Sequence, residues 1–238
     1  MLLKAYAWIS VQLRPTVRNM GKALQYDVSL LERMYTQNFE SPWMARTMLD
    51  VQYRSPRDLN HFPSEEFYEG RLRTHDGNAN VSSRLQDVGF PWPVLDGFTI
   101  PAVFIQCSAE EDMGGQSKSN EGQVEVVRRI LPLLQGDISV TILSPYTKQI
   151  KLLRGAANVP CSTIDSFQGR ESDVIIFSTV RCNVEADVGF LDDPRRLNVM
   201  WTRARLALII IGDRRTLEAN PLWKRAIGAC REVAVDVS

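Results

Sequence analysis

The sequence has no excess of charge of either sign, and it contains few cysteine and histidine residues. Lys plus Arg and Asp plus Glu number 28 each in 238 residues, so the formal net charge is zero. Zero net charge gives no global sign of a nucleic-acid partner, although a local basic groove is compatible with it. The four cysteines form no C-x-x-C pair, and only two histidines accompany them. We therefore expect reduced thiols, no disulfide framework and no bound metal.

Long apolar runs, internal repeats and low-complexity segments are also absent. No run reaches the roughly 18 apolar residues that a membrane span requires. The mildly apolar start, residues 1–10, is too short for a secretory signal and lacks a cleavage-site pattern. These absences predict an intracellular protein, in the nucleus or the cytoplasm. An apolar fraction of 44% with five Trp and nine Phe residues is ample for a packed core.

The second half of the chain shows a regular alternation of strand and helix patterns. Strands are expected over residues 100–105, 138–143, 174–180 and 206–211, and helices over 120–134, 146–153, 193–204 and from 220 onward. Near-continuous apolar runs at 174–180 and 206–211 are typical of strands covered on both faces. The alternation predicts an α/β fold, with a doubly wound, mostly parallel sheet and helices on both faces.

Two stretches have a less regular pattern. Residues 1–48 form a ragged beginning with a loop-like region around Pro15, Gly21 and Lys22, followed by a helical run that carries Leu30, Leu31 and Met34. Residues 70–97 are rich in Gly, Asn, Asp, Ser and Pro. This composition predicts a long surface connection, which is usually functional or mobile.

Two segments carry side chains suited to phosphate or base contacts. In open α/β sheets, such residues gather just beyond the carboxyl ends of the strands. In the segment 51–56, Arg54 suits a phosphate and Tyr53 suits base stacking. The alternative is a surface Arg paired with a carboxylate beside a partly buried Tyr. In the segment 144–149, hydroxyls and Lys148 could touch a sugar–phosphate backbone, or the segment is only a capped helix start.

Two further segments precede and follow the strand at 174–180. The segment 162–173 offers hydroxyls, Gly169 and Glu171, which suit phosphate binding by backbone N–H groups and positioning of a water or an Arg. The alternative is an ordinary capped turn. In the segment 193–205, a helix would place Arg196 and Arg203 on one face, where they suit phosphoryl-group recognition. The alternative there is a solvated basic face.

Together and in this order, the four segments resemble the C-terminal motifs of superfamily-one helicases of the nonsense-mediated-decay type, whose relatives include the NFX-type zinc-finger proteins. In chain order, residues 12–15 resemble the end of the third motif, and residues 52–54 resemble the Gln-Tyr-Arg motif. Residues 144–146 resemble the strand-end motif, residues 165–171 the fifth motif and residues 195–205 the sixth motif. The resemblance covers about residues 11–227. One such string would be weak, but the ordered set is specific.

The resemblance implies a RecA-like second motor domain at 49–232, preceded at 1–48 by the end of a first motor domain and a linker. Arg54 and Arg203 would contact the γ-phosphate of ATP, with Arg203 acting like an arginine finger. Gln12 would sense that phosphate, Gly169 and Glu171 would lie near the nucleotide, and Tyr53 would pack on the adenine. The nucleic-acid backbone would be contacted by Ser144, Pro145, Thr163, Asp165 and Ser166. The implied partners are ATP, with Mg²⁺ held by the first domain, and a single strand, more readily RNA than DNA.

The sequence departs from the family in what it lacks. No G-x-x-x-x-G-K-[ST] occurs, and residues 8–11 replace the usual Gly-Asp before the third motif. Glu110-Glu111-Asp112 follows an apolar run, but this place resembles the loop before the next helix of the family and not the Mg²⁺ carboxylate motif. We therefore expect a fragment or truncated gene model that begins partway through a motor and is inactive alone. Smaller departures are Ser55, Arg57 and the bulky Trp201.

Three functions are consistent with these observations. The first is the C-terminal half of an ATP-dependent RNA or DNA helicase. The second is a non-catalytic module, derived from a helicase, that binds nucleic acid or protein. The third is an unrelated α/β nucleotide-binding enzyme. The presence of Arg54, Glu171 and Arg203 together favours descent from a working motor, whereas the absent phosphate loop favours binding without turnover.

Overall fold

The computed structural model of the chain describes residues 3–6, 12–14, 24, 26–30, 32–33, 44–78, 82–112, 114–115 and 117–235. The predicted features at Pro15, Gly21, Lys22, Leu31 and Met34 lie outside these residues. Near the start, β1 (Leu3–Tyr6) pairs in parallel with β2 (Met44–Thr47). A second small parallel pair joins β3 (Val51–Gln52) to β4 (Arg73–Thr74).

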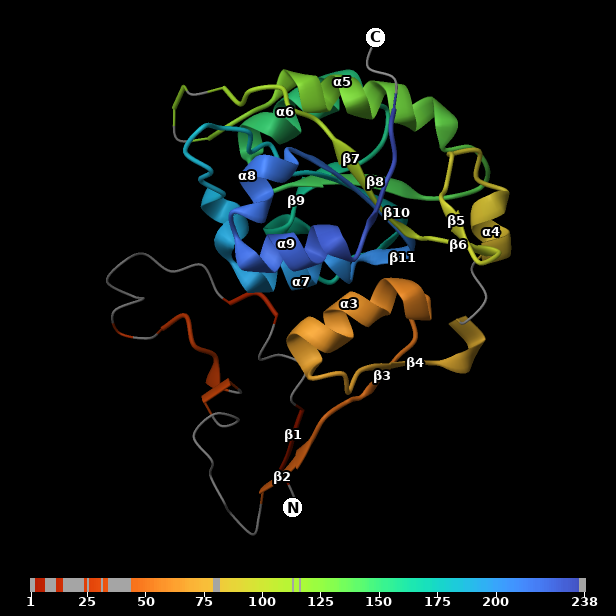
Figure 1. Ribbon diagram of the computed structural model, residues 1–238. Coiled ribbons are helices and arrows are strands. Elements are labelled where there is room, and N and C mark those ends of the chain that lie inside the picture. Colours follow the sequence, from red (N-terminus) through yellow and green to blue (C-terminus); the bar gives the residue numbers. More distant parts are fainter. Residues whose placement is uncertain are drawn as a thin grey trace.

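A six-stranded parallel sheet forms the centre of the molecule (Figure 1). Its strands are β7 (Ala102–Gln106), β8 (Val140–Ser144), β9 (Cys161–Thr163), β10 (Ser172–Ser178), β11 (Ala204–Gly212) and β12 (Arg231–Glu232). They lie in the order β12-β7-β11-β10-β8-β9, and every neighbouring pair is parallel. All of β10 is buried, as its continuous apolar run predicted. The predicted RecA-like α/β fold is confirmed.

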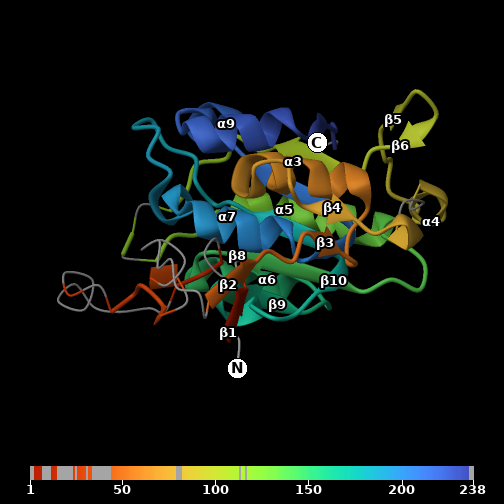
Figure 2. The same cartoon turned by 90° about the horizontal axis from the view of Figure 1, so that it is seen from below.

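Helices cover both faces of this sheet (Figures 1 and 2). They are α3 (Arg57–Tyr68), α5 (Glu121–Ile130), α6 (Thr147–Ala156), α7 (Pro194–Trp201), α8 (Arg214–Glu218) and α9 (Pro221–Gly228). One core cluster joins α3, α7 and α9 to Ile175 and Phe177 of β10. The other joins α5 and α6 to Val174 and Ile176 of the same strand. Alternate side chains of β10 therefore enter opposite layers.

Three helices, α5, α7 and α9, begin at the positions that their capping residues predicted. The side chain of Asn120 accepts a hydrogen bond from the backbone N–H of Gln123, that of Asp193 from Arg195, and that of Asn220 from Leu222 and Trp223. Pro194 and Pro221 occupy the first helical positions. Each cap satisfies a backbone donor that the helix itself cannot.

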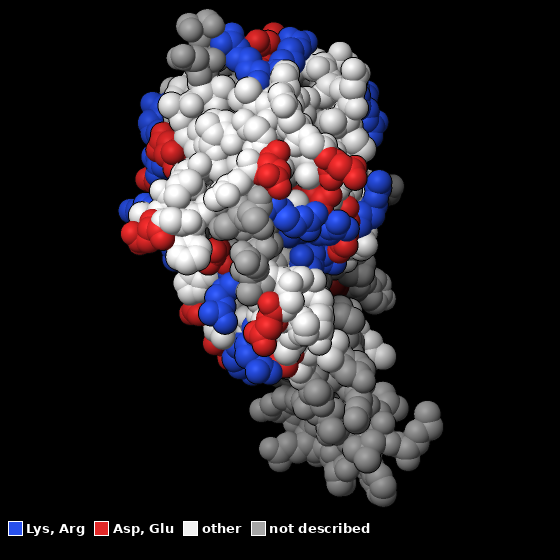
Figure 3. Space-filling model, turned by 90° about the vertical axis from the view of Figure 1, so that its right-hand side faces the viewer, with Lys and Arg blue, Asp and Glu red and all other residues white. Residues whose placement is uncertain are grey.

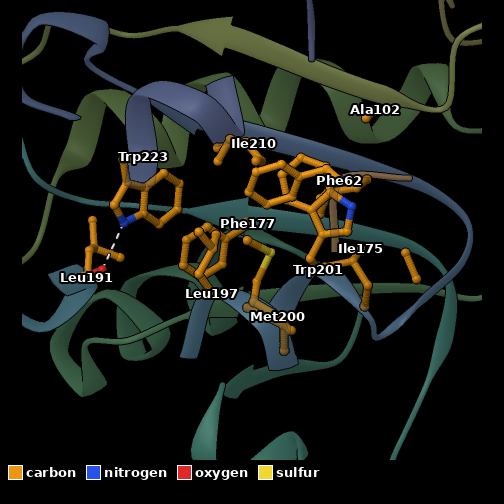
Figure 4. Close-up of a cluster of buried hydrophobic side chains, with 14 of the residues drawn as sticks. Phe62, Ala102, Ile175, Phe177, Leu191, Leu197, Met200, Trp201, Ile210 and Trp223 are labelled. Carbon is orange, nitrogen blue, oxygen red and sulfur yellow. Dashed lines mark hydrogen bonds between the residues drawn. The ribbon is translucent and has the colours of Figure 1, made fainter. Parts of the chain in front are cut away.

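The buried Trp201 completes a hydrogen bond that α3 cannot make alone. Pro63 lies inside α3 and has no N–H, so the carbonyl of Leu59 lacks its usual donor four residues later. The indole Nε1 of Trp201 donates to that carbonyl at 2.8 Å. The Trp201 ring lies 4.4 Å, centroid to centroid, from the ring of Phe62 (Figure 4). The bulky residue of the sixth motif therefore fixes α3 to α7.

The prediction of a helix through residue 204 is wrong. α7 ends at Trp201, and Ala204 already pairs with Ser172 at the start of β11. The Thr202 hydroxyl donates to the Asn198 carbonyl at 2.8 Å, and Arg203 Nε donates to the Val199 carbonyl at 3.0 Å. These side chains satisfy the last helical carbonyls and end the helix. Arg196 and Arg203 consequently do not share a helical face.

The prediction of a surface connection at 70–97 is also wrong in part. The described residues of this stretch include β4, α4 (Ser82–Gln86) and a hairpin of β5 (Val94–Leu95) and β6 (Phe98–Thr99), which begins within it. Its apolar residues Leu85, Val88, Phe90 and Trp92 are buried in the same cluster as α5. Sparse but well-placed apolar residues suffice to anchor a polar segment.

All four cysteines are free, as predicted. Burial raises the pKa of the Cys182 thiol to about 11 and that of Cys230 to about 12. Both are therefore protonated and unreactive at neutral pH. In the part of the chain that the structure describes, no helix is long and apolar enough to cross a membrane.

Candidate nucleotide and nucleic-acid interface

A cavity of about 520 Å³ lies beside the amino ends of β10 and β11. It is lined by Gln12, Leu49, Val51, Gln52, Tyr53, Arg54, Ser55, Asn60, Tyr68, Leu72, Glu171 and Thr202. Four of the residues predicted to face a nucleotide, Gln12, Tyr53, Arg54 and Glu171, thus come together. Their position differs from our expectation for open α/β sheets, because Glu171 precedes β10 instead of following a strand.

The loop that carries Tyr53 and Arg54 is organised by the buried amide of Gln52. Its Oε1 accepts hydrogen bonds from the backbone N–H groups of Arg54 at 2.8 Å and Ser55 at 2.9 Å. Its Nε2 donates to the Ser55 carbonyl and to Thr74 Oγ1, each at 2.7 Å. Ser55, a departure from the family motif, is buried and fits this arrangement. A fully bonded buried amide holds the loop in one conformation.

Arg54 is held by two partners at the mouth of the cavity. Its Nε donates to Glu171 Oε2 at 2.6 Å, and its Nη1 donates to the carbonyl of Thr202 at 2.9 Å. The hydrogen bond from Arg54 keeps the pKa of Glu171 below its ordinary value. Arg205 lies 3.7 Å from the other Glu171 oxygen and pairs more closely with Asp173 at 2.9 Å. Glu171 therefore orders the arginine cluster and offsets part of its charge.

Arg203 is a buried cation, only 5% exposed. Its guanidinium donates to the carbonyls of Val199 at 3.0 Å and Arg170 at 3.5 Å and to the Thr202 hydroxyl at 3.2 Å. Within the described residues it forms no ion pair with a carboxylate. Burial, together with the nearby charge of Arg54, lowers the pKa of Arg203 to about 10. It remains charged at neutral pH without a compensating anion of its own.

Of the other residues predicted to contact the nucleotide, Tyr53 and Gln12 line the cavity, whereas Gly169 does not line it. Tyr53 is largely exposed, and its ring lies 4.6 Å from that of His75. Gln12 Nε2 donates to the Tyr68 hydroxyl at 3.3 Å. Gly169 lies two residues before Glu171 in an exposed turn and has a φ of +81°, which glycine adopts without strain.

The residues predicted to contact a nucleic-acid backbone gather at the carboxyl ends of β8 and β9. Ser144 pairs in register with Thr163, whose hydroxyl bonds to that of Ser166 at 2.9 Å. Asp165 and Ser166 are exposed and Pro145 is half-buried, but the Ser144 side chain is fully buried. The structure therefore brings the five residues into one region, but the side chain of Ser144 does not reach the surface of that region.

Sequence reasoning missed Gln52, Thr202 and His75 as parts of this region. Gln52 belongs to the Gln-Tyr-Arg motif, so its place there was the available signal. Thr202 acts through its backbone carbonyl, which no sequence pattern reveals. His75 reaches Tyr53 only because β3 and β4 pair.

Comparison with known proteins identifies the family to which this arrangement belongs. The AAA_12 family, described as an AAA domain, matches residues 26–215. The chain belongs to this family. It is 36% identical over 230 residues to Helicase sen1 of Schizosaccharomyces pombe, covering 89% of this chain and 13% of that protein. The predicted place among superfamily-one helicases, as a C-terminal motor domain, is confirmed, and an unrelated enzyme is excluded.

Two other similar proteins are named as a regulator of nonsense transcripts and as an ATP-dependent helicase. Regulator of nonsense transcripts 1 homolog of Arabidopsis thaliana is 35% identical, covering 82% of this chain and 16% of that protein. ATP-dependent helicase NAM7 of Saccharomyces cerevisiae is 34% identical, and the match covers 77% of this chain and 20% of that protein. The chain thus spans between 13% and 20% of the length of these three relatives. The C-terminal domain of a possible DNA helicase from a Lactobacillus is similar in structure at a TM-score of 0.44 with 15% identity, covering 76% of this chain and 98% of that domain.

Proposed function

We propose that this chain supplies the second-domain half of the ATP site of a helicase that moves along single-stranded nucleic acid, RNA rather than DNA. In this proposal residues 49–232 form the second motor domain, and residues 1–48 contain the end of the first domain and the linker. The proposal also places the protein in the nucleus or the cytoplasm. It is supported by the cavity geometry and by the names of the relatives, which are helicases and regulators of nonsense transcripts.

The observation that carries the proposal is the pair of arginines beside the cavity. Among the described residues, Arg203 pairs with no carboxylate, and the carboxylate partner of Arg54, Glu171, also lies near Arg205. A buried cation without a counter-ion is unfavourable, and an anion that approaches it relieves that cost. Phosphate oxygens suit the planar donor set of arginine. The residues present therefore fit the phosphate end of a nucleotide.

Arg54 and Arg203 would act on the terminal phosphate in different ways. Arg54 already lines the cavity, whereas Arg203 is buried, does not line the cavity and bonds weakly, at 3.5 Å, to the Arg170 carbonyl. When the two motor domains close, Arg203 would exchange that contact for a phosphate oxygen and stabilise the charge that develops during transfer. Tyr53 and Gln12 would flank the base and the terminal phosphate. Mg²⁺ would be held by the first domain.

A second candidate function is binding without turnover. It is favoured by the sequence itself, which contains no phosphate-binding G-x-x-x-x-G-K-[ST] loop. In that case the region around Thr163, Asp165 and Ser166 would bind a single strand, and the arginine cluster would not act in ATP hydrolysis. On the face shown in Figure 3, the described acidic and basic side chains are interspersed, so charge on that face does not favour a broad nucleic-acid surface.

ATP hydrolysis by the purified chain, with and without single-stranded RNA, tests the proposal. We expect no turnover above background, because the chain contributes arginines but no phosphate-binding loop. The Arg203→Ala variant should give the same background. RNA-stimulated turnover that Arg203→Ala abolishes would contradict this result, since it would require a complete phosphate site within this chain.

A further inference from the structure

Phe190 is an exposed aromatic residue at the carboxyl end of the sheet that the proposed ATP half-site does not use. Phe190 is 54% exposed, although the next residue, Leu191, is buried. It lies in a 3₁₀ turn, Gly189–Asp192, between β10 and α7. We propose that Phe190 is a stacking platform for one base of the single strand, beside the residues that hold its backbone. This inference rests on the proposed function and adds a base contact to it.

The turn that presents Phe190 is rigidly built. Gly189 has a φ of +53°, and a Cβ at this position would lie 2.2 Å from Arg181 Nη1 and 2.8 Å from the Tyr146 hydroxyl. The Gly189 N–H donates to Asp187 Oδ1 at 2.8 Å, and the Leu191 carbonyl accepts from Trp223 Nε1 at 2.8 Å (Figure 4). Only glycine fits this close approach. The exposure of Phe190 is therefore a fixed feature of the turn.

A polar network centred on the buried Arg181 side chain supports the turn. Arg181 donates to the Tyr146 hydroxyl at 3.2 Å and to Asp187 at 2.8 Å, and its Nε lies 3.0 Å from Glu111. Asn183 binds both the N–H and the carbonyl of Asp187, each at 2.9 Å. Arg181 Nε makes no hydrogen bond of good geometry among the described residues, but the remaining hydrogen bonds still join Tyr146, Arg181, Asn183 and Asp187. The exposed ring is thus preorganised, and a ligand would not have to order it on binding.

The contacts of Phe190 lead directly to the predicted backbone-binding residues. Its ring centroid lies 5.5 Å from that of Tyr146, which follows the strand-end Ser144-Pro145. The Arg196 guanidinium lies 5.6 Å from the same ring and 3.4 Å from Asp165. Asp165 belongs to the turn whose Ser166 bonds to Thr163. Phe190 therefore lies on the rim of the region expected to hold the sugar–phosphate chain.

An aromatic side chain in this position suits a nucleobase better than other ligands. Single-strand-binding proteins combine a groove that follows the backbone with aromatic rings on which successive bases stack. Every base has a π-face, so a lone exposed ring gives affinity with little sequence preference. Arg196, next to the ring and partly paired with Asp165, can contact the adjoining phosphate. The ring and the guanidinium together match one nucleotide.

Fluorescence anisotropy with two single strands of about 12 units tests this inference. One strand is oligouridine, and the other is an abasic sugar–phosphate chain of equal length. On oligouridine, Phe190→Ala should weaken binding by about 5- to 150-fold, because a base-stacking contact contributes roughly that much, and Phe190→Trp should retain binding. On the abasic chain, Phe190→Ala should bind like the wild type. The control is Phe98→Ala, which removes a 65% exposed ring from the β5–β6 hairpin, at the right of Figure 1.

The possible outcomes separate this inference from the proposed function. If Phe190→Ala binds oligouridine as the wild type does, or weakens both strands equally, Phe190 is not a stacking platform, while backbone binding stands. If the wild type binds neither strand, the nucleic-acid part of the proposed function fails and this inference fails with it. An unchanged melting temperature of Phe190→Ala, expected from the exposure of the ring, shows that any loss of binding is local.

Discussion

Replacing Arg203 by Ala should lower ATP turnover by at least about 10³-fold in a complete motor, the magnitude typical of an arginine finger. The complete motor can be a chimera that joins the first motor domain of the Saccharomyces cerevisiae NAM7 helicase to this chain. Arg203 is buried next to Arg54 and has no carboxylate partner among the described residues, and we propose that its charge stabilises the transferred phosphate. Single-turnover hydrolysis in the presence of RNA measures the effect.

Two further variants make this experiment selective. Arg225→Ala, which removes an exposed arginine paired with Glu66 on the surface, should leave turnover unchanged. Arg203→Lys retains the positive charge but loses the planar donor set, so it should restore only a small part of the activity. Turnover of Arg203→Ala within about twofold of the wild type would show that Arg203 is a structural residue and that another group stabilises the transferred phosphate.

Replacing Trp201 by Ala should destabilise the domain by about 3–5 kcal/mol, the usual cost of removing a buried tryptophan. Trp201 is 1% exposed, packs against Phe62 and donates to the Leu59 carbonyl. For a domain of this size, the melting temperature should fall by about 6–20 °C. Thermal unfolding followed by circular dichroism measures the change. Phe98→Ala, which removes an exposed ring, should change the melting temperature little.

A double-mutant cycle tests the hydrogen bond of Trp201 separately from its packing. Trp201→Phe leaves the Leu59 carbonyl without a donor and should cost about 1–3 kcal/mol. In a Pro63→Ala background, residue 63 regains an N–H that can reach this carbonyl within α3, so the same change should cost less. Equal costs in both backgrounds would show that Trp201 acts on α3 by packing alone.

The strands and helix starts of the sheet could be predicted because their causes are local. The apolar runs at 174–180 and 206–211 have no polar alternation, which leaves burial on both faces as the only stable outcome. Asp193-Pro194 and Asn220-Pro221 each combine a capping side chain with a residue suited to the first helical turn. The grouping of Arg54 with Glu171, 117 residues apart, followed only from the ordered set of motifs.

Features that depend on distant partners could not be predicted. The end of α7 depends on the pairing of Ala204 with Ser172 at the start of β11, so the periodic apolar pattern continued past the end of the helix. The hydrogen bond of Trp201 could not be predicted, because its partner, the Leu59 carbonyl freed by Pro63, lies in another element. Likewise, the polar stretch 70–97 gave no sign that Phe90 and Trp92 would be buried against the helices. Tertiary contacts decide each of these cases.

The central claim is that a nucleotide joins this domain to a first motor domain through Arg54 and Arg203. Its most direct test is the affinity of this chain for the separately produced first motor domain of the NAM7 helicase. Calorimetry would compare that affinity with and without a non-hydrolysable ATP analogue and Mg²⁺. We expect the analogue to tighten association at least about tenfold, or roughly 1.4 kcal/mol, and the Arg54→Ala/Arg203→Ala variant to lose that gain. Association that is equally strong without the analogue, or equally enhanced in the double variant, would contradict the claim.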